Sequence, residues 1–445
     1  MRFRIVLSAL LAGACATDEI SLVDMGPAPA APAYIADMAG EVVRGLPVNF
    51  TQAQVGDAVA PDLLVSASGE KIRNARDWRE KRRPEIADML EENQYGTPPR
   101  VETLRFAQAA ISYSERGVPA LDGKALRSQS TIELAGLATR TIDVLLYTPA
   151  TATGPSPVVL MINFSPNAIM IDDPAVKVTD GWTSEGKRVP GMTARAIAKQ
   201  DLMPFLSRGY GVALVYYSQI EPDFLGGSAF GLRAVYKAVD EAQRAPGEAG
   251  SISTWAEGLS LVRQHLAMDP AVDGKRIALY GISRLGKTVL WAGANDPEFA
   301  AVIAVCSGEG GGALSRRNYG ETVGHVAASF PYWFTPRWNG FAASPAASPV
   351  DSHMVMAMIA PRPLMIIAGE TDAWSDPWGE FLAARLATPV YQLLGKQGVD
   401  AAPELDQVTG GELSVLLHKG GHGPAPADTP AILDFLDRYM PAVSR

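Results

Sequence analysis

A serine stands where a strand-like run of residues gives way to a helix-like run. Residues 276–280 are strand-like, and the segment Gly281–Lys287 that follows has the sequence Gly-Ile-Ser-Arg-Leu-Gly-Lys, with Ser283 near its centre. A sharp strand-to-helix turn exposes a serine hydroxyl, and the next peptide N–H faces the oxygen that becomes negative when a carbonyl is attacked. The usual pattern has glycine two places after the serine, but here Leu285 stands there and the glycine is Gly286. We interpret Ser283 as the nucleophile of a variant of this turn.

A serine nucleophile needs a general base, and the base needs an orienting acid, in the chain order serine, acid, histidine for this kind of turn. His265 precedes the serine within a helix-like run. His422 lies in a glycine-rich segment after the last apolar run, where it is free to reach the edge of a sheet. We therefore predict His422 as the base. His418, at the end of that run, is the alternative base, but its position favours a structural role. The chain contains five histidines: His265, His325, His353, His418 and His422.

Two carboxylates compete for the role of orienting acid. Asp372 follows the apolar run 364–368, just after the next-to-last strand, where such an acid normally stands. Glu309 follows the earlier run 302–305 in a segment rich in glycine, which would let its carboxylate approach the histidine from another side. We predict Asp372 and retain Glu309 as the alternative acid.

Two cations lie beside the serine. Arg284 occupies a position that normally contributes only its backbone N–H, and its guanidinium would stabilise an oxyanion with a permanent charge. A merely solvated arginine would be poorly placed against the positive end of a helix dipole, which favours the oxyanion role. Lys287 follows Ser283 by four residues, on the same face of the expected helix, so we place it near the pocket, with a solvated lysine as the alternative.

Short, almost wholly apolar runs recur along the chain and alternate with helix-like segments such as 255–268 and 425–440. Continuous apolarity indicates strands buried on both faces, which is typical of a parallel sheet covered by helices. Together with the serine turn, this alternation predicts an α/β-hydrolase: a doubly wound, mostly parallel sheet flanked by helices. The apolar runs are 158–162, 212–216, 277–280, 302–305, 364–368 and 413–417.

Composition narrows the classes of partner. The 445 residues carry a net charge of −9, which argues against nucleic acid or an anionic membrane surface as a partner. The histidines show no paired ligand spacing, so we do not expect a metal hydrolase. Of the two cysteines, Cys15 belongs to an N-terminal targeting segment, and Cys306 ends an apolar run, so we expect a buried free thiol and no internal disulfide.

The N-terminus has the features of an export signal. A short basic region precedes an apolar stretch, and cleavage could follow Ala16. The alternative is a lipobox-like sequence that would lipidate Cys15 and supply the chain's one attachment to a membrane. We expect a signal peptide over residues 1–16, a mobile Ala/Pro-rich linker over 17–58 and one catalytic domain over 59–445. The expected location is exported: periplasmic, outer-membrane lipoprotein or secreted.

Several segments between residues 60 and 445 resemble the glucuronoyl esterases, family 15 of the carbohydrate esterases, bacterial type. The most specific are the Ser-Arg-x-Gly-Lys turn and the Ala-Pro-Arg-Pro sequence at 360–363. The segments that carry the resemblance are Tyr216–Asp223, Gly281–Lys287, Ser307–Gly311, Leu314–Arg317, Tyr319–Thr322, Phe330–Phe334, Asp351–His353, Ile359–Pro363, Asp372–Glu380 and Gly421–Gly423.

The resemblance implies a 4-O-methyl-glucuronoyl methylesterase that cleaves the ester between 4-O-methyl-glucuronate on xylan and lignin alcohols, without metal or cofactor. It also implies that Lys287, Glu321 and Trp374 hold the hydroxyls of the uronate ring. Fungal members carry their acid where this chain has Cys306, whereas bacterial members often use an aspartate where Asp372 stands. The resemblance therefore favours Asp372 and leaves the role of Glu309 open.

We expect a monomeric enzyme whose partner is glucuronoxylan or a lignin–carbohydrate ester. Two other functions remain open at this point. One is another carbohydrate esterase, of the acetylxylan or feruloyl type. The other is a surface carbohydrate-binding protein that kept this fold and lost activity.

Overall fold

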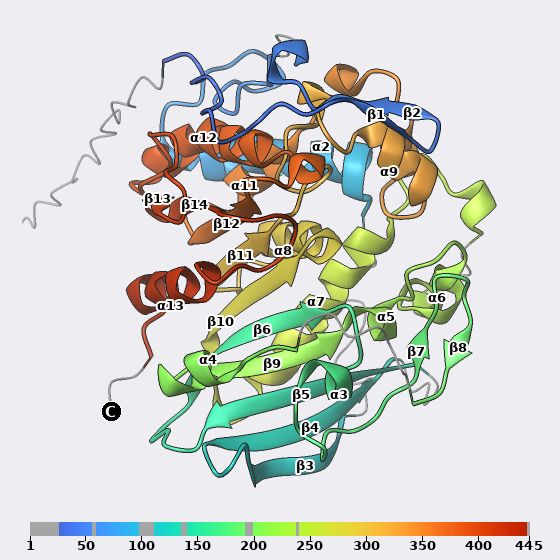
Figure 1. Cartoon of the computed structure of the whole chain (residues 1–445), viewed down its shortest axis with the longest axis vertical. Helices are drawn as coiled ribbons and strands as arrows, with labels where there is room; N and C mark the ends of the chain where they lie inside the picture. Colours follow the sequence, from blue (N-terminus) through green and yellow to red (C-terminus); the bar gives the residue numbers. More distant parts are fainter. Residues whose placement is uncertain are drawn as a thin grey trace, which may run out of the picture.

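The computed structural model describes residues 26–55, 59–97, 111–134, 140–191, 199–236 and 240–442. These residues build one large sheet of ten strands, which twists from β3 at the bottom of Figure 1 to β13 near the top. In spatial order the strands are β13 (Val408–Gly410), β14 (Leu413–His418), β12 (Leu364–Gly369), β11 (Ala301–Val305), β10 (Val272–Ile282), β6 (Ser156–Asn163), β9 (Gly211–Tyr216), β5 (Thr141–Pro149), β4 (Ala125–Glu133) and β3 (Ile111–Ala120).

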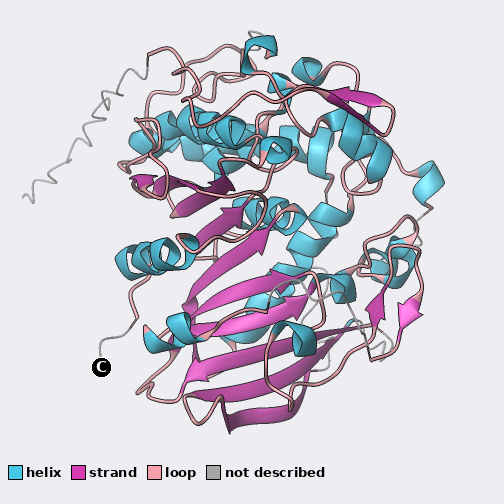
Figure 2. Cartoon of the chain, viewed as in Figure 1, coloured by secondary structure: helices cyan, strands magenta, loops and turns pink. Residues whose placement is uncertain are grey.

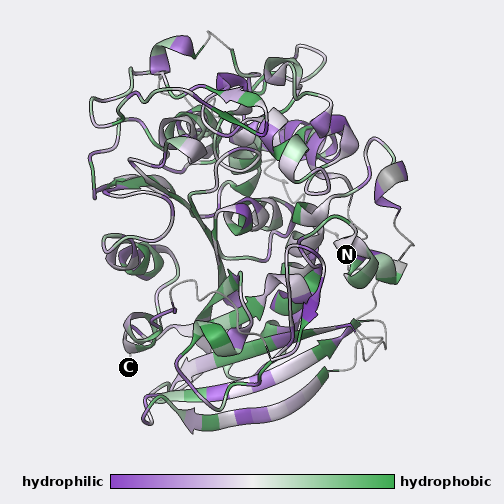
Figure 3. Ribbon diagram, turned by 45° about the vertical axis from the view of Figure 1, so that its right-hand side comes forward, coloured by the Kyte–Doolittle hydropathy of each residue, from purple (hydrophilic) through white to green (hydrophobic). Residues whose placement is uncertain are grey.

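The six central strands, from β14 to β9, run parallel to one another. These are the six apolar runs of the sequence, and the buried, mostly parallel sheet that the runs predict is confirmed. The outer strands β13, β5, β4 and β3 pair in the antiparallel direction, so the sheet is mixed. Figure 3 shows more hydrophilic positions in the lowest strands, in keeping with the largely exposed β3.

Helices cover both faces of the sheet, as the two core clusters show (Figure 2). On β10, Leu279 packs into the first cluster, while its neighbours Ala278 and Tyr280 pack into the second. The first cluster includes side chains of α7 (Ser251–Ala267), α8 (Arg284–Asn295), α11 (Ser352–Ile359) and α12 (Pro377–Leu393). The second includes side chains of α3 (Asn167–Met170), α4 (Met203–Ser207) and α13 (Asp428–Tyr439). Because alternate residues of one strand enter different cores, the strands must be apolar throughout.

The remaining elements lie around this body. None of the helices in the described ranges is both long and apolar enough to cross a membrane. The short strands form two hairpins, β1 (Glu41–Val43) with β2 (Leu46–Val48), and β7 (Gly181–Trp182) with β8 (Arg188–Val189). The other helices are α1 (Ala75–Asp77), α2 (Arg83–Leu90), α5 (Tyr217–Ile220), α6 (Arg233–Tyr236), α9 (Val323–Ser329) and α10 (Pro336–Asn339).

The N-terminal segment corrects the expectation of a mobile linker over residues 17–58. Residues 26–55 lie against the catalytic body, where Val48 and Phe50 form a small core with Tyr319. The backbone N–H of Gly320 also donates to the carbonyl of Asn49 at 2.8 Å. The Ala/Pro-rich composition indicated flexibility, but the apolar side chains that follow it find partners on the body. Residues 1–25, including the predicted signal segment, lie outside the described residues.

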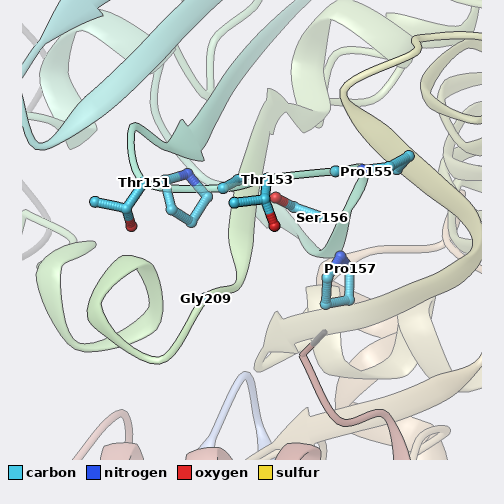
Figure 4. Close-up of a pocket in the computed structure, with 9 residues that line it drawn as sticks. Thr151, Thr153, Pro155, Ser156, Pro157 and Gly209 are labelled. Carbon is cyan, nitrogen blue, oxygen red and sulfur yellow. The ribbon is translucent and has the colours of Figure 1, made fainter. Parts of the chain in front are cut away.

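Because the central strands run parallel, the segments that follow five of them begin at the same edge of the sheet. The carboxyl ends of β9, β10, β11, β12 and β14 meet there, and each is followed by a segment that the sequence singles out. The opposite edge holds a small depression lined by the β5–β6 loop, including Thr151 and Ser156, and by Gly209 (Figure 4). Since Ser156 begins β6, this depression lies where the parallel strands start, away from the predicted site.

Candidate active site

Ser283 forms a sharp turn between β10 and α8. Its backbone has φ 58° and ψ −129°, a region that non-glycine residues seldom occupy. The Ser283 N–H donates to the carbonyl of Val305 at 2.8 Å, which ties the turn to the end of β11. Strained backbone of this kind is typical of a nucleophile held above the end of its strand.

Two glycines make room for this turn. A Cβ at Gly281 would lie 2.3 Å from the carbonyl oxygen of Leu285, so any side chain there would collide with the backbone of α8. A Cβ at Gly286 would lie 3.0 Å from the Cβ of Ser307, at the end of the neighbouring strand. Leu285, by contrast, is fully buried in the core. The shifted glycine of the sequence pattern is therefore the residue that packs closely against β11.

The imidazole of His422 lies against the carboxylate of Asp372. Nδ1 of His422 is 2.7 Å from Oδ2 of Asp372 and 3.2 Å from the hydroxyl oxygen of Ser375. Burial opposes the charge of Asp372, but the hydrogen bonds from His422 and Ser375 outweigh it, and the pKa of the carboxyl is lowered. An ionised Asp372 holds the proton of His422 on Nδ1 and leaves Nε2 free to accept one, as a general base requires. The imidazole is 45% exposed, so it is accessible from solvent.

The loop that carries His422 is fixed on both sides. The N–H of Gly420 donates to Glu370 at 2.5 Å, and the N–H of Gly423 donates to the sulfur of Cys306 at 3.4 Å. Before the loop, His418 bonds Asp428 at 2.8 Å, and this carboxylate outweighs the effect of burial and raises the pKa of His418. His418 therefore anchors the loop that places His422.

The three other histidines have structural partners. His265 Nε2 lies 2.7 Å from the hydroxyl of Ser130, but among the residues that the structure describes its Nδ1 is buried without a partner, so none of their acids orients this pair. Ser130 lies within β4, on the antiparallel part of the sheet, rather than on a strand-to-helix turn. His325 forms a helix cap with Thr322, and His353 forms a hydrogen bond with the carbonyl of Pro61.

Arg284 lies at the first position of α8 with its guanidinium partly exposed. Nη1 donates to Oδ2 of Asp223 at 2.5 Å, and the guanidinium carbon lies 4.7 Å from the ring centre of Trp333. Burial works against its charge, but the carboxylate of Asp223 more than offsets this and raises the pKa of Arg284. A permanent positive charge thus stands next to Ser283.

The structure brings together the three residues that the resemblance assigns to the uronate ring. Nζ of Lys287 donates to the carbonyl of Ser307 at 2.7 Å and lies 3.7 Å from Oε2 of Glu321. The N–H of Glu321 donates to the carbonyl of Trp374 at 2.8 Å. Lys287 and Glu321 together present a mixed set of donors and acceptors, which suits sugar hydroxyls.

Two further carboxyl groups near the site are buried, and burial raises the pKa of each. Burial raises the pKa of Glu309 well above its usual range, and its carboxyl accepts a hydrogen bond from Ser315. The carboxylate that meets His422 belongs to Asp372, whereas Glu309 bonds Ser315 instead. Burial also raises the pKa of Glu380 to about 8, although it accepts from Ser307 and Gly308.

Among the described residues, one group of side chains has the donor types of a metal site: Cys306, Asp372 and His422, whose donor atoms lie within 4.8 Å of one another. Burial, together with the charge of Asp372, raises the pKa of the Cys306 thiol, so it remains a neutral and weak ligand. Asp372 already bonds Nδ1 of His422. This chemistry suits an acid–base pair beside a buried thiol better than a resident metal ion.

The strained turn of Ser283 and the pair of His422 with Asp372 lie at one edge of a parallel sheet, and the guanidinium of Arg284 lies beside the serine. This arrangement defines a serine hydrolase of the α/β-hydrolase class. Comparison with known proteins makes the assignment more specific. Residues 241–395 match the family described as "Glucuronyl esterase, fungi".

Similarity to individual proteins extends over most of the chain. "Carbohydrate esterase MZ0003", from an unknown prokaryotic organism, is 38% identical over 405 residues, which cover 88% of this chain and 92% of that protein. A glucuronoyl esterase from Solibacter usitatus superposes with a TM-score of 0.82 at 36% identity, over 87% of this chain and 100% of the other. A structure described as a promiscuous CE15 esterase from a marine bacterial metagenome gives 0.77 at 35% identity, over 88% and 100%. The chain belongs to carbohydrate esterase family 15, the glucuronoyl esterases.

Sequence reasoning gave no role to some residues that the structure places at the site. Asp223 follows β9 much as Asp372 follows β12. Its position as a carboxylate beyond an apolar run could therefore have indicated that it lies at the site. Glu380 lies inside α12, and nothing in its sequence context indicates that it reaches Ser307 on another element.

Proposed function

We propose that this chain is an exported serine esterase that hydrolyses esters of 4-O-methyl-glucuronate, as in the linkages between glucuronoxylan and lignin alcohols. The observation that carries the proposal is the 2.7 Å contact between His422 and Asp372, at the sheet edge where the turn of Ser283 lies. Membership of the glucuronoyl esterase family supports the substrate class. The basic and apolar N-terminal sequence supports export.

The proposed reaction proceeds through an acyl-enzyme. Oγ of Ser283 attacks the ester carbonyl while Nε2 of His422 takes its proton, and Asp372 stabilises the imidazolium through Nδ1. The guanidinium of Arg284 stabilises the oxyanion. The intermediate collapses as His422 gives its proton to the leaving alcohol. Water, activated by His422, then hydrolyses the acyl-enzyme and releases the uronate.

The site suits an uncharged sugar ester. Lys287, Glu321 and Trp374 form the wall assigned to the uronate ring, and the buried Lys287 is flanked by an acidic partner at 3.7 Å. An esterified uronate carries no charge, so a few mixed donors and acceptors suffice, and a densely basic cleft is unnecessary.

The test is hydrolysis of benzyl glucuronate by the wild-type enzyme and by Ser283→Ala. We expect turnover by the wild type, loss of turnover in the variant, and fluorophosphonate labelling that disappears with Ser283. Faster release of acetate from acetylated xylan, or of ferulate from a feruloyl ester, would instead favour another carbohydrate esterase. Absence of both labelling and turnover in folded wild-type protein would favour the carbohydrate-binding function.

A further inference from the structure

The guanidinium of Arg284 is held from one side by a carboxylate that has no assigned role. Asp223 lies after α5, beyond the carboxyl end of β9, and its Oδ2 is 2.5 Å from Nη1 of Arg284. Within the described part of the chain, Nε of Arg284 is buried without a hydrogen-bond partner. The arginine side chain retains 29% exposure, whereas that of Asp223 retains 4%. Solvent therefore reaches the arginine of this ion pair but is largely excluded from the aspartate.

Three aromatic side chains donate to the same carboxylate. Oδ1 of Asp223 accepts from Tyr332 at 3.0 Å and from the indole N–H of Trp333 at 2.8 Å, while Oδ2 accepts from Tyr217 at 3.1 Å. With Arg284, four donors converge on this one carboxylate and fix its orientation. Burial and the charge of Asp223 raise the pKa of Tyr332, so this donor keeps its proton.

Aromatic rings also surround the guanidinium itself. Its central carbon lies 4.7 Å from the ring centre of Trp333, 5.2 Å from Phe330 and 5.8 Å from Phe164. Phe330 and Trp333 stack with ring centres 3.8 Å apart. These rings restrict the directions in which Arg284 can turn, and they exclude water that would otherwise screen its charge.

The segment that carries Asp223 is itself anchored. Glu221 is fully buried and bonds Arg233 through two nitrogens, at 2.6 and 2.9 Å. Its backbone carbonyl accepts from the indole of Trp255 at 2.8 Å. Asp223 therefore meets Arg284 from a fixed part of the structure.

The chemistry of the reaction gives this ion pair a purpose. The substrate ester is neutral, but hydrolysis of the acyl-enzyme returns the proton to Ser283 and yields a uronic acid that ionises and releases a further proton to water. An unpaired guanidinium, poorly screened among aromatic rings, would bind that carboxylate strongly. A guanidinium paired with Asp223 forms a unit without net charge, which still directs N–H groups at a transient oxyanion.

We propose that Asp223 is a positioning residue with two effects on the proposed esterase: it orients Arg284 through one nitrogen, and it offsets the charge of Arg284 so that the anionic product leaves. The inference rests on the proposed function, because it concerns the uronate which that reaction forms. Asp223 acts through Arg284 and needs no contact with the substrate.

The experiment compares wild type with Asp223→Asn on benzyl glucuronate, with glucuronate as a product inhibitor and the neutral glucuronamide as its matched control. We expect kcat to fall by about tenfold or more, since a misdirected donor loses part of its oxyanion stabilisation. We also expect the inhibition constant of glucuronate to fall by about tenfold, which is the scale of one added charge-assisted contact. Inhibition by glucuronamide should stay unchanged.

The control variant is Asp173→Asn, which removes the charge of another aspartate that meets an arginine and a tyrosine. Asp173 contacts Arg127 at 2.6 Å and Tyr147 at 2.7 Å, and Tyr147 pairs with Val212 at the start of β9, away from the site. We expect neither kcat nor the glucuronate inhibition constant to change in this variant. Asp223→Glu keeps the charge and shifts its position. We expect this variant to bind glucuronate as weakly as wild type does, but to recover only part of the wild-type kcat.

The double variant Arg284→Gln with Asp223→Asn covers the case in which Asp223→Asn is unstable, because it leaves neither a buried guanidinium nor a buried carboxylate without its partner. We expect the double variant to bind glucuronate no more tightly than wild type, because the cation that Asp223 offsets is absent. Tighter glucuronate binding in the double variant than in wild type would overturn the inference, as would unchanged or weaker glucuronate binding in folded Asp223→Asn. Failure of wild type to hydrolyse the ester would instead contradict the proposed function.

Discussion

At the scale of single residues, the contact between His422 and Asp372 shows how burial and hydrogen bonding compete. The side chain of Asp372 is only 4% exposed, and burial alone would favour its neutral form. Its hydrogen bonds reverse that balance and lower its pKa. At the nearby Cys306, the hydrogen bond from the N–H of Gly423 does not offset burial, and the pKa of the thiol is raised. Two neighbouring acids are thus held in opposite protonation states.

Replacing Asp372 should slow catalysis strongly but leave substrate binding largely intact. We expect Asp372→Asn to lower kcat on benzyl glucuronate by about 10⁴-fold, because an amide stabilises the wrong tautomer of His422. The Michaelis constant should change far less. Asp376→Asn is the control, since Asp376 caps α12 and pairs with Arg317 instead. Equal losses of kcat in the two variants would contradict the role of Asp372.

The charge of Arg284 should matter in the transition state. We expect Arg284→Ala to lower kcat by about 100-fold or more, the scale of one lost oxyanion donor. Arg284→Lys should recover little, since a lysine cannot meet Asp223 and an oxyanion with one planar group. Steady-state kinetics measure both, and an unchanged kcat in Arg284→Ala would remove Arg284 from this role.

At the scale of elements, the turn between β10 and α8 depends on close backbone packing. We expect Gly281→Ala to lower both activity and the melting temperature, because its Cβ would lie 2.3 Å from the carbonyl oxygen of Leu285. The two elements would have to separate, which displaces Ser283. Gly154→Ala is the control, since nothing lies within 4 Å of a Cβ there. Thermal unfolding and kcat together measure the effect.

The N-terminal segment acts as a support for the loop of Glu321. Phe50 is 5% exposed and meets the ring of Tyr319 edge to face at 6.2 Å, one residue before the bond between Gly320 and Asn49. This arrangement connects a segment outside the predicted catalytic domain to the wall assigned to the sugar.

Weakening this support should affect binding more than chemistry. We expect Phe50→Ala to raise the Michaelis constant for benzyl glucuronate about fivefold, as for a loss of roughly 1 kcal/mol of binding, with a smaller change in kcat. Met38→Ala is a suitable control, because Met38 lies in the same segment but is 51% exposed. A fall in kcat at constant Michaelis constant would show that the segment serves Ser283 or His422 instead.

At the scale of the whole molecule, much of the fold could be predicted because its strands are locally distinct. The run Val158–Ile162, for example, is apolar at every position, and β6 is buried on both faces. Chain order alone then placed residues 283, 372 and 422 beyond parallel strands. The contacts of Asp223 and Glu380 could not be predicted in this way, because they join side chains 61 and 73 positions apart through packing. Composition also misled at residues 26–55, where a few apolar side chains outweigh many flexible ones.

The buried Glu380 should give the whole protein a measurable pH dependence. Its pKa in the folded state is about 8, above the ordinary value of 4.5, so between these values the folded state holds a proton that the unfolded state has lost. Glu380 therefore reduces stability as pH rises, by up to about 1.4 kcal/mol per pH unit.

The variant Glu380→Gln should remove this dependence, because the amide oxygen can still accept from Ser307 and Gly308. We expect the free energy of unfolding of the variant, relative to wild type, to increase from pH 5 to pH 8. Urea denaturation at several pH values measures it, and parallel curves for the two proteins would show that Glu380 does not titrate in this interval.

The docked N-terminal segment also limits how far an anchored enzyme could work from its membrane. If Cys15 carries a lipid, the ten residues between it and Gly26 are all the chain available as a tether, because the segment after Gly26 is already engaged on the body. Fully stretched, that tether spans at most about 40 Å. Lipidated molecules would then be confined to a thin layer above the bilayer, where soluble xylan fragments arrive by diffusion, and intact plant cell walls would lie beyond their reach.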